Sequence, residues 1–146
     1  MYIIPILRGE TNMCVRLPFK TLKPAGTIDI NEASSIMLDK LEEMGVDAEI
    51  YLPDKNFKVY RKSDVIKSEA LAEISAIEYI PEEHDCDDFA AKLYGKWAGL
   101  VWTNKHAMNW FISDEGKFYF VEPQNKNISE TLDAWQGDDI RFLIGR

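Results

Sequence analysis

The strongest constraint on the fold of this chain is a pair of aromatic and β-branched runs at residues 106–112 and 117–122. The residues between them read Ser-Asp-Glu-Gly, a composition typical of a tight turn, so the two runs predict an antiparallel β-hairpin. Side chains alternate between the faces of a strand, so His106 and Glu122 share one face, opposite or diagonal to each other. The hairpin therefore predicts an imidazole held by a carboxylate.

A helix is predicted to begin at Cys86. Asp85 is a suitable N-cap, and Pro81 prevents an earlier helix from continuing into this region. Apolar side chains then recur at helical spacing: Phe89, Ala90, Leu93 and Trp97. Unpaired backbone N–H groups and the positive end of the helix dipole would surround the sulfur, which favours the thiolate.

The thiol, the imidazole and the carboxylate form the pattern of a nucleophile, a base and an orienting group. Cys86 would attack a carbonyl carbon, His106 would accept and later donate the proton, and Glu122 would hold the imidazole. Asn109 and Gln124 are alternative orienting groups. A lone cysteine or histidine is more often structural, so the prediction depends on the combination.

Three segments carry a resemblance to a known family: Asp85-Cys86-Asp87-Asp88-Phe89-Ala90, His106-Ala107-Met108-Asn109 and Glu122-Pro123-Gln124. Over about residues 79–125 the chain resembles the papain-like cysteine-protease domain at the C-terminus of a mushroom agglutinin and related bacterial and phage proteins. The resemblance implies a papain-like fold and a triad of Cys86, His106 and Glu122. It also implies dependence on a divalent cation such as calcium, with Asp87 and Asp88 among its ligands.

The chain departs from this family in three respects. It lacks a carbohydrate-binding repeat like the one that precedes the protease in the agglutinin, so we expect no lectin activity to carry over. Residues 77–85 contain no glutamine, whereas papain has one a few residues before its cysteine. An oxyanion would then bind the Cys86 backbone N–H and an unidentified side chain. The segment between Cys86 and His106 is short, which suits a papain-like core smaller than the full two-domain papain fold.

The acidic residues near the cysteine allow more than one interpretation. These residues are Glu82, Glu83, Asp85, Asp87 and Asp88. A helix dipole favours carboxylates at its N-terminus without any metal, while an oxygen-rich cluster also suits calcium. Zinc held by His84, Cys86 and His106 is a further alternative, although the chain has neither a CxxC nor an HExxH pattern.

Composition limits the remaining possibilities. With 146 residues and 46% hydrophobic content, the chain is long enough for one domain over residues 1–146, in which 1–78 resemble no known family and 79–146 form the papain-like portion. A net charge of −8 argues against nucleic acid and anionic membranes as partners and favours a neutral or cationic ligand. Two cysteines and no signal peptide predict a reduced, cytoplasmic protein.

Outside the hairpin, strands are predicted at residues 2–7, 48–52, 56–61, 77–80 and 140–144. Helices are predicted at residues 31–45, capped by Asn31, and at 63–74. Residues 11–26 are expected to be irregular and 128–135 to be looped or weakly helical. Early helices and late antiparallel strands indicate an α+β fold with the Cys86 helix packed on an antiparallel sheet.

The sequence thus favours a small papain-like cysteine hydrolase, a thiol peptidase or amidase with a peptide or amide substrate. The alternative is a non-catalytic metal-binding interaction module, such as a phage accessory protein. The missing upstream glutamine favours the alternative, whereas the complete triad favours the hydrolase.

Overall fold

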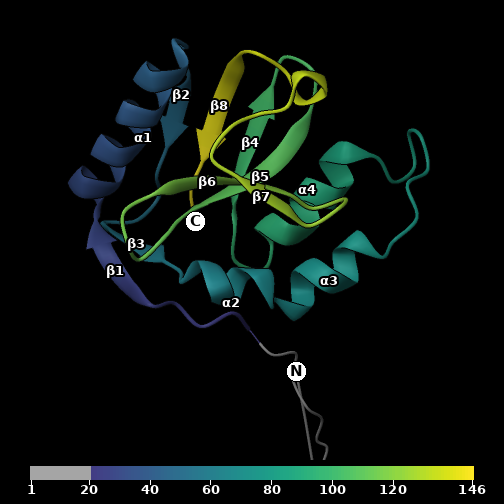
Figure 1. Ribbon diagram of the computed structural model, residues 1–146, viewed down its shortest axis with the longest axis horizontal. Helices are drawn as coiled ribbons and strands as arrows, with labels where there is room; N and C mark the ends of the chain where they lie inside the picture. Colours follow the sequence, from purple (N-terminus) through teal and green to yellow (C-terminus); the bar gives the residue numbers. More distant parts are fainter. Residues whose placement is uncertain (1–20) are drawn as a thin grey trace, which may run out of the picture.

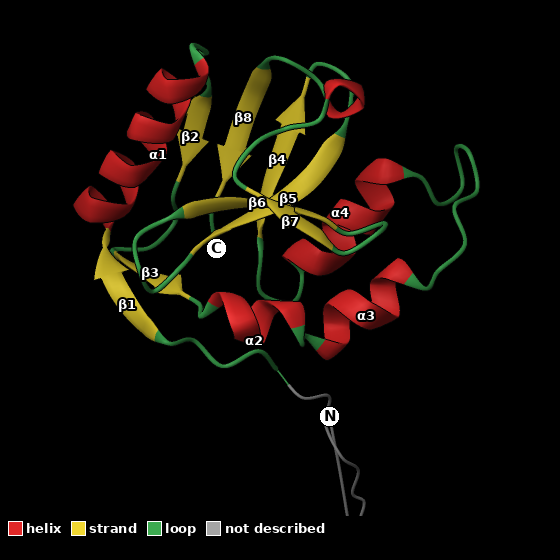
Figure 2. Ribbon diagram, viewed as in Figure 1, coloured by secondary structure: helices red, strands yellow, loops and turns green. Residues whose placement is uncertain are grey.

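A computed structural model describes residues 21–146 and shows an α+β fold built on a six-stranded sheet (Figures 1 and 2). The strand order is β2-β8-β4-β5-β6-β7. The strands are β2 (Glu49–Tyr51), β4 (Gly99–Thr103), β5 (Ala107–Ile112), β6 (Phe118–Glu122), β7 (Asn127–Ser129) and β8 (Ile140–Ile144). Only the β2–β8 pair is parallel within this sheet, so the predicted antiparallel sheet is confirmed for the other pairs.

The remaining elements are a two-stranded antiparallel sheet and five helical segments. The small sheet pairs β1 (Gly26–Asp29) with β3 (Asn56–Val59). The helices are α1 (Ile30–Met44), α2 (Lys62–Ile66), α3 (Glu69–Ser75) and α4 (Cys86–Tyr94), and η1 (Ala134–Gln136) is a short 3₁₀ helix. None of the helices within residues 21–146 is long and apolar enough to cross a lipid bilayer.

The central strands are covered on both faces, which explains why β5 and β6 are buried along their whole length. Alternate residues of β5 belong to different apolar clusters. Trp110 packs in the cluster that contains Met37 of α1, whereas Phe111 packs in the cluster that contains Phe89 of α4. Helices α1 and α4 therefore cover opposite faces of the sheet, as Figure 1 shows.

Helix α1 illustrates how local signals set the element boundaries. The Asp29 carboxylate accepts a hydrogen bond from the Glu32 N–H at 2.9 Å, so Asp29 is the N-cap instead of the predicted Asn31. At the other end Gly45 has a φ of 72°, a left-handed conformation that glycine adopts without steric cost. The inward stripe of Ala33, Met37 and Leu41 is buried as its spacing predicts.

Several predicted elements differ from the structure. The predicted helix at residues 63–74 is divided into α2 and α3, because the Ser68 hydroxyl caps a new helix by accepting the Leu71 N–H at 3.2 Å. Residues 77–80 form no strand and contribute only an isolated bridge between Ile80 and His84. Strands β1, β4 and β7 were not predicted. The predicted strand at residues 2–7, Cys14 and most of the irregular segment lie outside the described residues.

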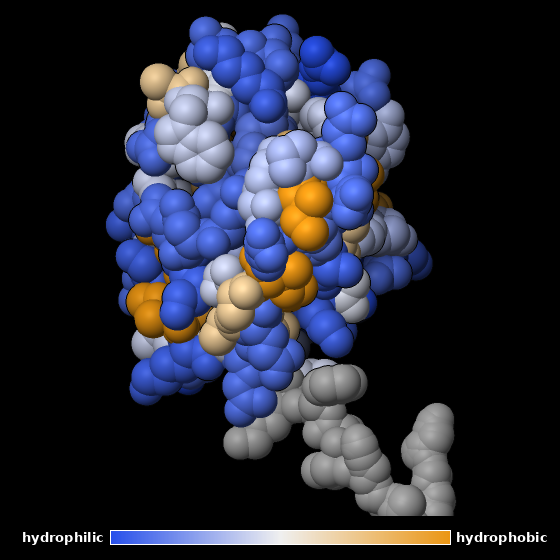
Figure 3. Space-filling view, turned by 90° about the vertical axis from the view of Figure 1, so that its right-hand side faces the viewer, coloured by the Kyte–Doolittle hydropathy of each residue, from blue (hydrophilic) through white to orange (hydrophobic). Residues whose placement is uncertain are grey.

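The loop after α3 exposes a few apolar side chains beside α4. The exposed residues here are Ile77, Tyr79 and Ile80. Figure 3 views this side of the molecule and shows hydrophobic groups as small patches separated by hydrophilic ones. The apolar cluster behind the loop joins Ile74 to Phe89 and Leu93, so the boundary near residue 79 does not separate two cores.

A close contact between β4 and β5 gives a test of this packing. A Cβ atom on Gly99 would lie 2.4 Å from the Trp110 ring, which is itself stacked against Phe57 and Phe118 and has little room to move. We expect Gly99→Ala to lower the free energy of unfolding by about 1–3 kcal/mol in urea denaturation. Gly26→Ala is the control, because its nearest neighbour would lie at 4.0 Å. Equal stability of the two variants would contradict this packing.

Candidate functional site

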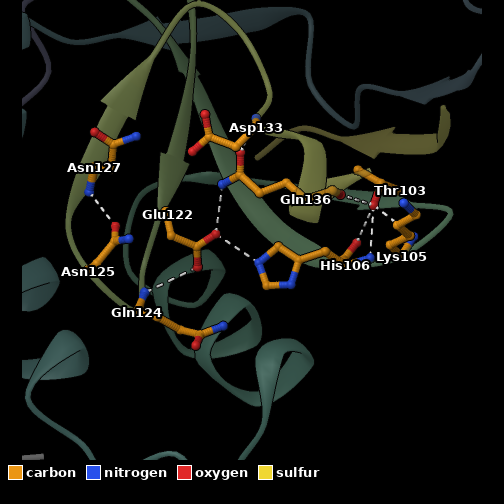
Figure 4. A network of polar contacts seen from close by, with 9 residues as sticks. All are labelled: Thr103, Lys105, His106, Glu122, Gln124, Asn125, Asn127, Asp133 and Gln136. Carbon is orange, nitrogen blue, oxygen red and sulfur yellow. Dashed lines mark hydrogen bonds and ion pairs between the residues drawn. The ribbon is translucent and has the colours of Figure 1, made fainter. Parts of the chain in front are cut away.

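The centre of the site is a buried pair formed by His106 and Glu122. The register of the hairpin pairs Asn109 with Val121, so His106, just before β5, lies diagonal to Glu122 at the end of β6. His106 Nε2 lies 2.8 Å from Glu122 Oε1, and the two side chains are only 6% and 1% exposed. Figure 4 shows the other ring nitrogen facing away from the carboxylate. The predicted juxtaposition of these two residues is confirmed.

Further donors satisfy the Glu122 carboxylate. Gln136 Nε2 donates a hydrogen bond to Oε1 at 3.0 Å, and the Gln124 backbone N–H donates to Oε2 at 3.3 Å (Figure 4). A buried carboxylate needs several such partners because it has lost its hydration. Gln124 therefore supports Glu122 through its backbone instead of orienting His106. Gln136 was not predicted, because only the fold brings it to the hairpin.

Thr103 connects His106 to the segment that carries Gln136. Its hydroxyl accepts the His106 backbone N–H at 2.8 Å and donates to the Gln136 carbonyl at 2.6 Å. The next residue is Gly137, which has a φ of 118°. A Cβ atom added at this position would lie 2.7 Å from the Thr103 hydroxyl oxygen. A residue other than glycine would strain this junction.

The aromatic residue beside His106 is Trp135 of η1. The two ring centroids are 4.8 Å apart at 61°, an edge-to-face contact, and Trp135 is 51% exposed. Trp110 shares a hairpin face with His106 by strand parity. It does not cover the imidazole, because it stacks between the Phe57 and Phe118 rings in the core.

Cys86 is the first residue of α4, as predicted. The Asp85 N–H donates to the Asp88 carboxylate at 3.2 Å within a reciprocal capping box, and Phe89 is buried on the predicted inward face. Cys86 is partly buried and accepts a hydrogen bond from the Ala107 N–H, at the start of β5. Its sulfur thus contacts the backbone next to His106.

The surroundings of Cys86 favour the thiol form. Burial raises the pKa of the Cys86 thiol, and the nearby Asp85 and Asp87 carboxylates raise it further. The N–H groups of Ala107 and Asp87 act in the opposite direction but do not reverse the shift. His106 is not among the groups that act on this pKa. The expectation that the helix start produces a thiolate is therefore wrong, because desolvation and negative charge outweigh the N–H groups.

Asn109 holds α4 against the sheet and does not contact His106. Its side-chain nitrogen donates to the Ala90 carbonyl of α4 and to the Gly99 carbonyl of β4, each at 2.9 Å. It therefore connects the helix that carries Cys86 to two strands. The alternative in which Asn109 orients the imidazole is not supported.

Oxygen atoms of three aspartates near Cys86, namely Asp85, Asp87 and Asp88, lie within 4.8 Å of one another. A hydrogen bond with Asp87 lowers the pKa of Asp85, and the same bond raises the pKa of Asp87. The two carboxylates therefore interact directly with each other. The ligation of calcium by Asp87 and Asp88 stays a prediction.

The alternative zinc site is not assembled in the described residues, where the aspartate cluster is the one group with metal-ligand geometry. His84 packs edge-on against Phe89 with centroids 4.4 Å apart, and both of its ring nitrogens are buried without a hydrogen-bond partner. His106 is instead held by Glu122.

Comparisons with known proteins match this chain at the level of the fold. No family model and no curated protein matches it. A structure described as a PSL1a–E64 complex has a TM-score of 0.65 and 23% identity, covering 81% of this chain and 50% of that chain. Polyporus squamosus lectin bound to the human-type influenza-binding epitope Neu5Aca2-6Galb1-4GlcNAc has a TM-score of 0.64 and 22% identity, covering 81% and 49%. This chain spans about half the length of both.

These matches correct the family and function predicted from the sequence. The similar structures are those of a lectin and not of a papain-like protease, so the papain-like family, the thiol peptidase or amidase activity and the peptide or amide substrate are overturned. Nothing in the matches supports calcium or a phage origin. At this level of identity the likeness shows the fold alone.

The raised pKa of Cys86 predicts slow alkylation. A thiol whose pKa lies above its ordinary value carries less thiolate at a given pH, so iodoacetamide should modify Cys86 more slowly at pH 7 than a free cysteine peptide. Asp87→Asn removes one of the charges responsible and should accelerate the reaction. Asp39→Asn, which is remote in sequence, is the control. Peptide mass spectrometry measures the rates, and alkylation faster than that of the free peptide would contradict the assignment.

Proposed function

We propose that this chain is a carbohydrate-binding module whose ligand site consists of Trp135 and the polar network beneath it, formed by His106, Glu122 and Gln136. The observation that carries this proposal is the half-exposed Trp135 indole, which rests edge-on against the buried imidazole of His106, whose Nε2 is held by Glu122. A large aromatic side chain left half in water beside ordered polar groups is typical of a binding surface.

The chemistry of a sugar matches this arrangement. A pyranose ring has apolar C–H groups on its faces and hydroxyl groups around its rim. The exposed indole of Trp135 provides an apolar surface for the ring face. The network beneath it holds the His106 ring by its Nε2, so the surface under the indole is fixed before a ligand binds.

The charge of the chain favours a neutral glycan. The net charge is −8, and the three aspartates at the start of α4 lie on the Cys86 side of the site. An acidic sugar such as the Neu5Ac in the epitope of the second lectin structure would be repelled. The remaining Galb1-4GlcNAc part of that epitope is uncharged and is the better probe for this chain.

The likeness to a lectin supports the same proposal from the fold. It extends over 81% of this chain but over only half of each lectin chain. The sugar epitope named for the second structure belongs to that whole protein. The proposal for this chain therefore depends on its own site residues and has to be tested on them.

Binding to a neutral glycan provides the direct test. We expect N-acetyllactosamine to bind the wild-type chain in isothermal titration calorimetry, and Trp135→Ala to weaken the affinity at least about tenfold by removing the stacking surface. Tyr51→Ala is the matched control, since Tyr51 is equally exposed, at 52%, on the edge strand β2. Equal loss in both variants, or no binding by the wild type, would contradict the proposal.

A second candidate role concerns Cys86, His106 and Glu122 as nucleophile, base and orienting carboxylate. It is favoured by the 2.8 Å contact between His106 and Glu122 and by the contact of Cys86 with the Ala107 N–H. The first similar structure is a complex with E64, so E64 is a suitable probe of this role. An E64 adduct on Cys86 that requires His106 would support it, and an unmodified Cys86 would not.

Calcium binding by Asp87 and Asp88 is tested by thermal unfolding. A cation that binds only the folded chain raises the melting temperature, so millimolar calcium should raise it if the aspartates are ligands. The double variant Asp87→Asn with Asp88→Asn should then lose the shift. The control is the exposed pair Asp39→Asn with Asp47→Asn. An unchanged melting temperature in calcium would leave the aspartates as a helix cap.

A further inference from the structure

Residues 130–136 bring Trp135 and Gln136 from the end of β7 to the His106–Glu122 pair. At its far end this segment is held by the hydrogen bond of 2.6 Å between the Thr103 hydroxyl and the Gln136 carbonyl. At its near end the Glu130 carbonyl accepts a hydrogen bond of 2.9 Å from Lys40 Nζ. The segment is thus anchored at both ends, and the second anchor comes from α1, which is distant in the sequence.

Lys40 is unusual among the lysines of residues 21–146 because only 6% of it is exposed. An ammonium group in such a position needs partners that replace its hydration. Its ion pair with Glu43 is 3.5 Å long, but the Glu43 side chain is 66% exposed, so water screens this interaction. The neutral carbonyl of Glu130 accepts a hydrogen bond from the ammonium, and this bond fixes Lys40 and the segment to each other.

We propose that Lys40 is a positioning residue for the ligand site, acting through Glu130 on the segment that carries Trp135 and Gln136. This inference rests on the proposed function, because it assigns to Lys40 the geometry of that same site. Without the anchor, Leu132 still packs against the core, so the segment keeps its general course. What changes is the placement of Trp135 on His106, which depends on both ends of the segment.

The spectrum of His106 reports that placement without any ligand. The chain has two histidines, and the Trp135 ring current acts on His106, whereas His84 packs against Phe89. In histidine side-chain NMR spectra, Lys40→Met should move the His106 signal toward its position in Trp135→Ala. Lys40→Arg should restore the wild-type position by donating to Glu130. Glu43→Gln, which removes only the exposed ion pair, should leave the signal in place.

Glycan titration of the same variants separates this inference from the proposed function. If both hold, Lys40→Met weakens N-acetyllactosamine binding by about fivefold, the loss expected for one hydrogen bond, and Glu43→Gln does not. If the wild type binds no glycan but the His106 signal moves only in Lys40→Met, positioning by Lys40 is supported and the glycan site is not. A folded Lys40→Met with an unchanged His106 signal, or an equal shift in Glu43→Gln, overturns the inference.

Discussion

The candidate site depends on one buried carboxylate, that of Glu122. A carboxylate with 1% exposure is stable only if hydrogen-bond donors replace the water it has lost, and here they come from His106, Gln136 and the Gln124 backbone. Each donor belongs to a different part of the chain near the end of the hairpin. The hydrogen bond from Gln136 to Glu122 therefore helps to hold η1, and with it Trp135, beside the hairpin.

This polar network contains His106 but not Cys86, although the sequence predicts these two residues to act together. Glu122 holds the His106 imidazole. The pKa of the Cys86 thiol is instead raised by burial and by the Asp85 and Asp87 carboxylates. Such surroundings suit a structural cysteine at a helix start. The exposed part of the site is the Trp135 indole, while His106, Glu122 and Gln136 beneath it are buried.

The resemblance seen in the sequence and the likeness seen in the structure concern different scales of the molecule. The matched motifs are short and surround Cys86, His106 and Glu122, and they describe a local arrangement of side chains that the structure contains in part. The structural match extends over 81% of the chain, and at 23% and 22% identity it shows a likeness of fold. Motifs of a few residues specify local geometry better than they specify function, because function depends on the charge and exposure around them.

Local signals in the sequence determined the elements that position the site. The hairpin register, the capped start of α4 and the contact between His106 and Glu122 all follow from side-chain periodicity and short-range hydrogen bonding. Tertiary structure alone decided which groups complete the site. Gln136, Trp135 and Lys40 are remote from the hairpin in sequence, and no local pattern marks them, since their places result from satisfying buried polar groups. The pKa of Cys86 was likewise decided in three dimensions, because burial has no signature in the order of residues.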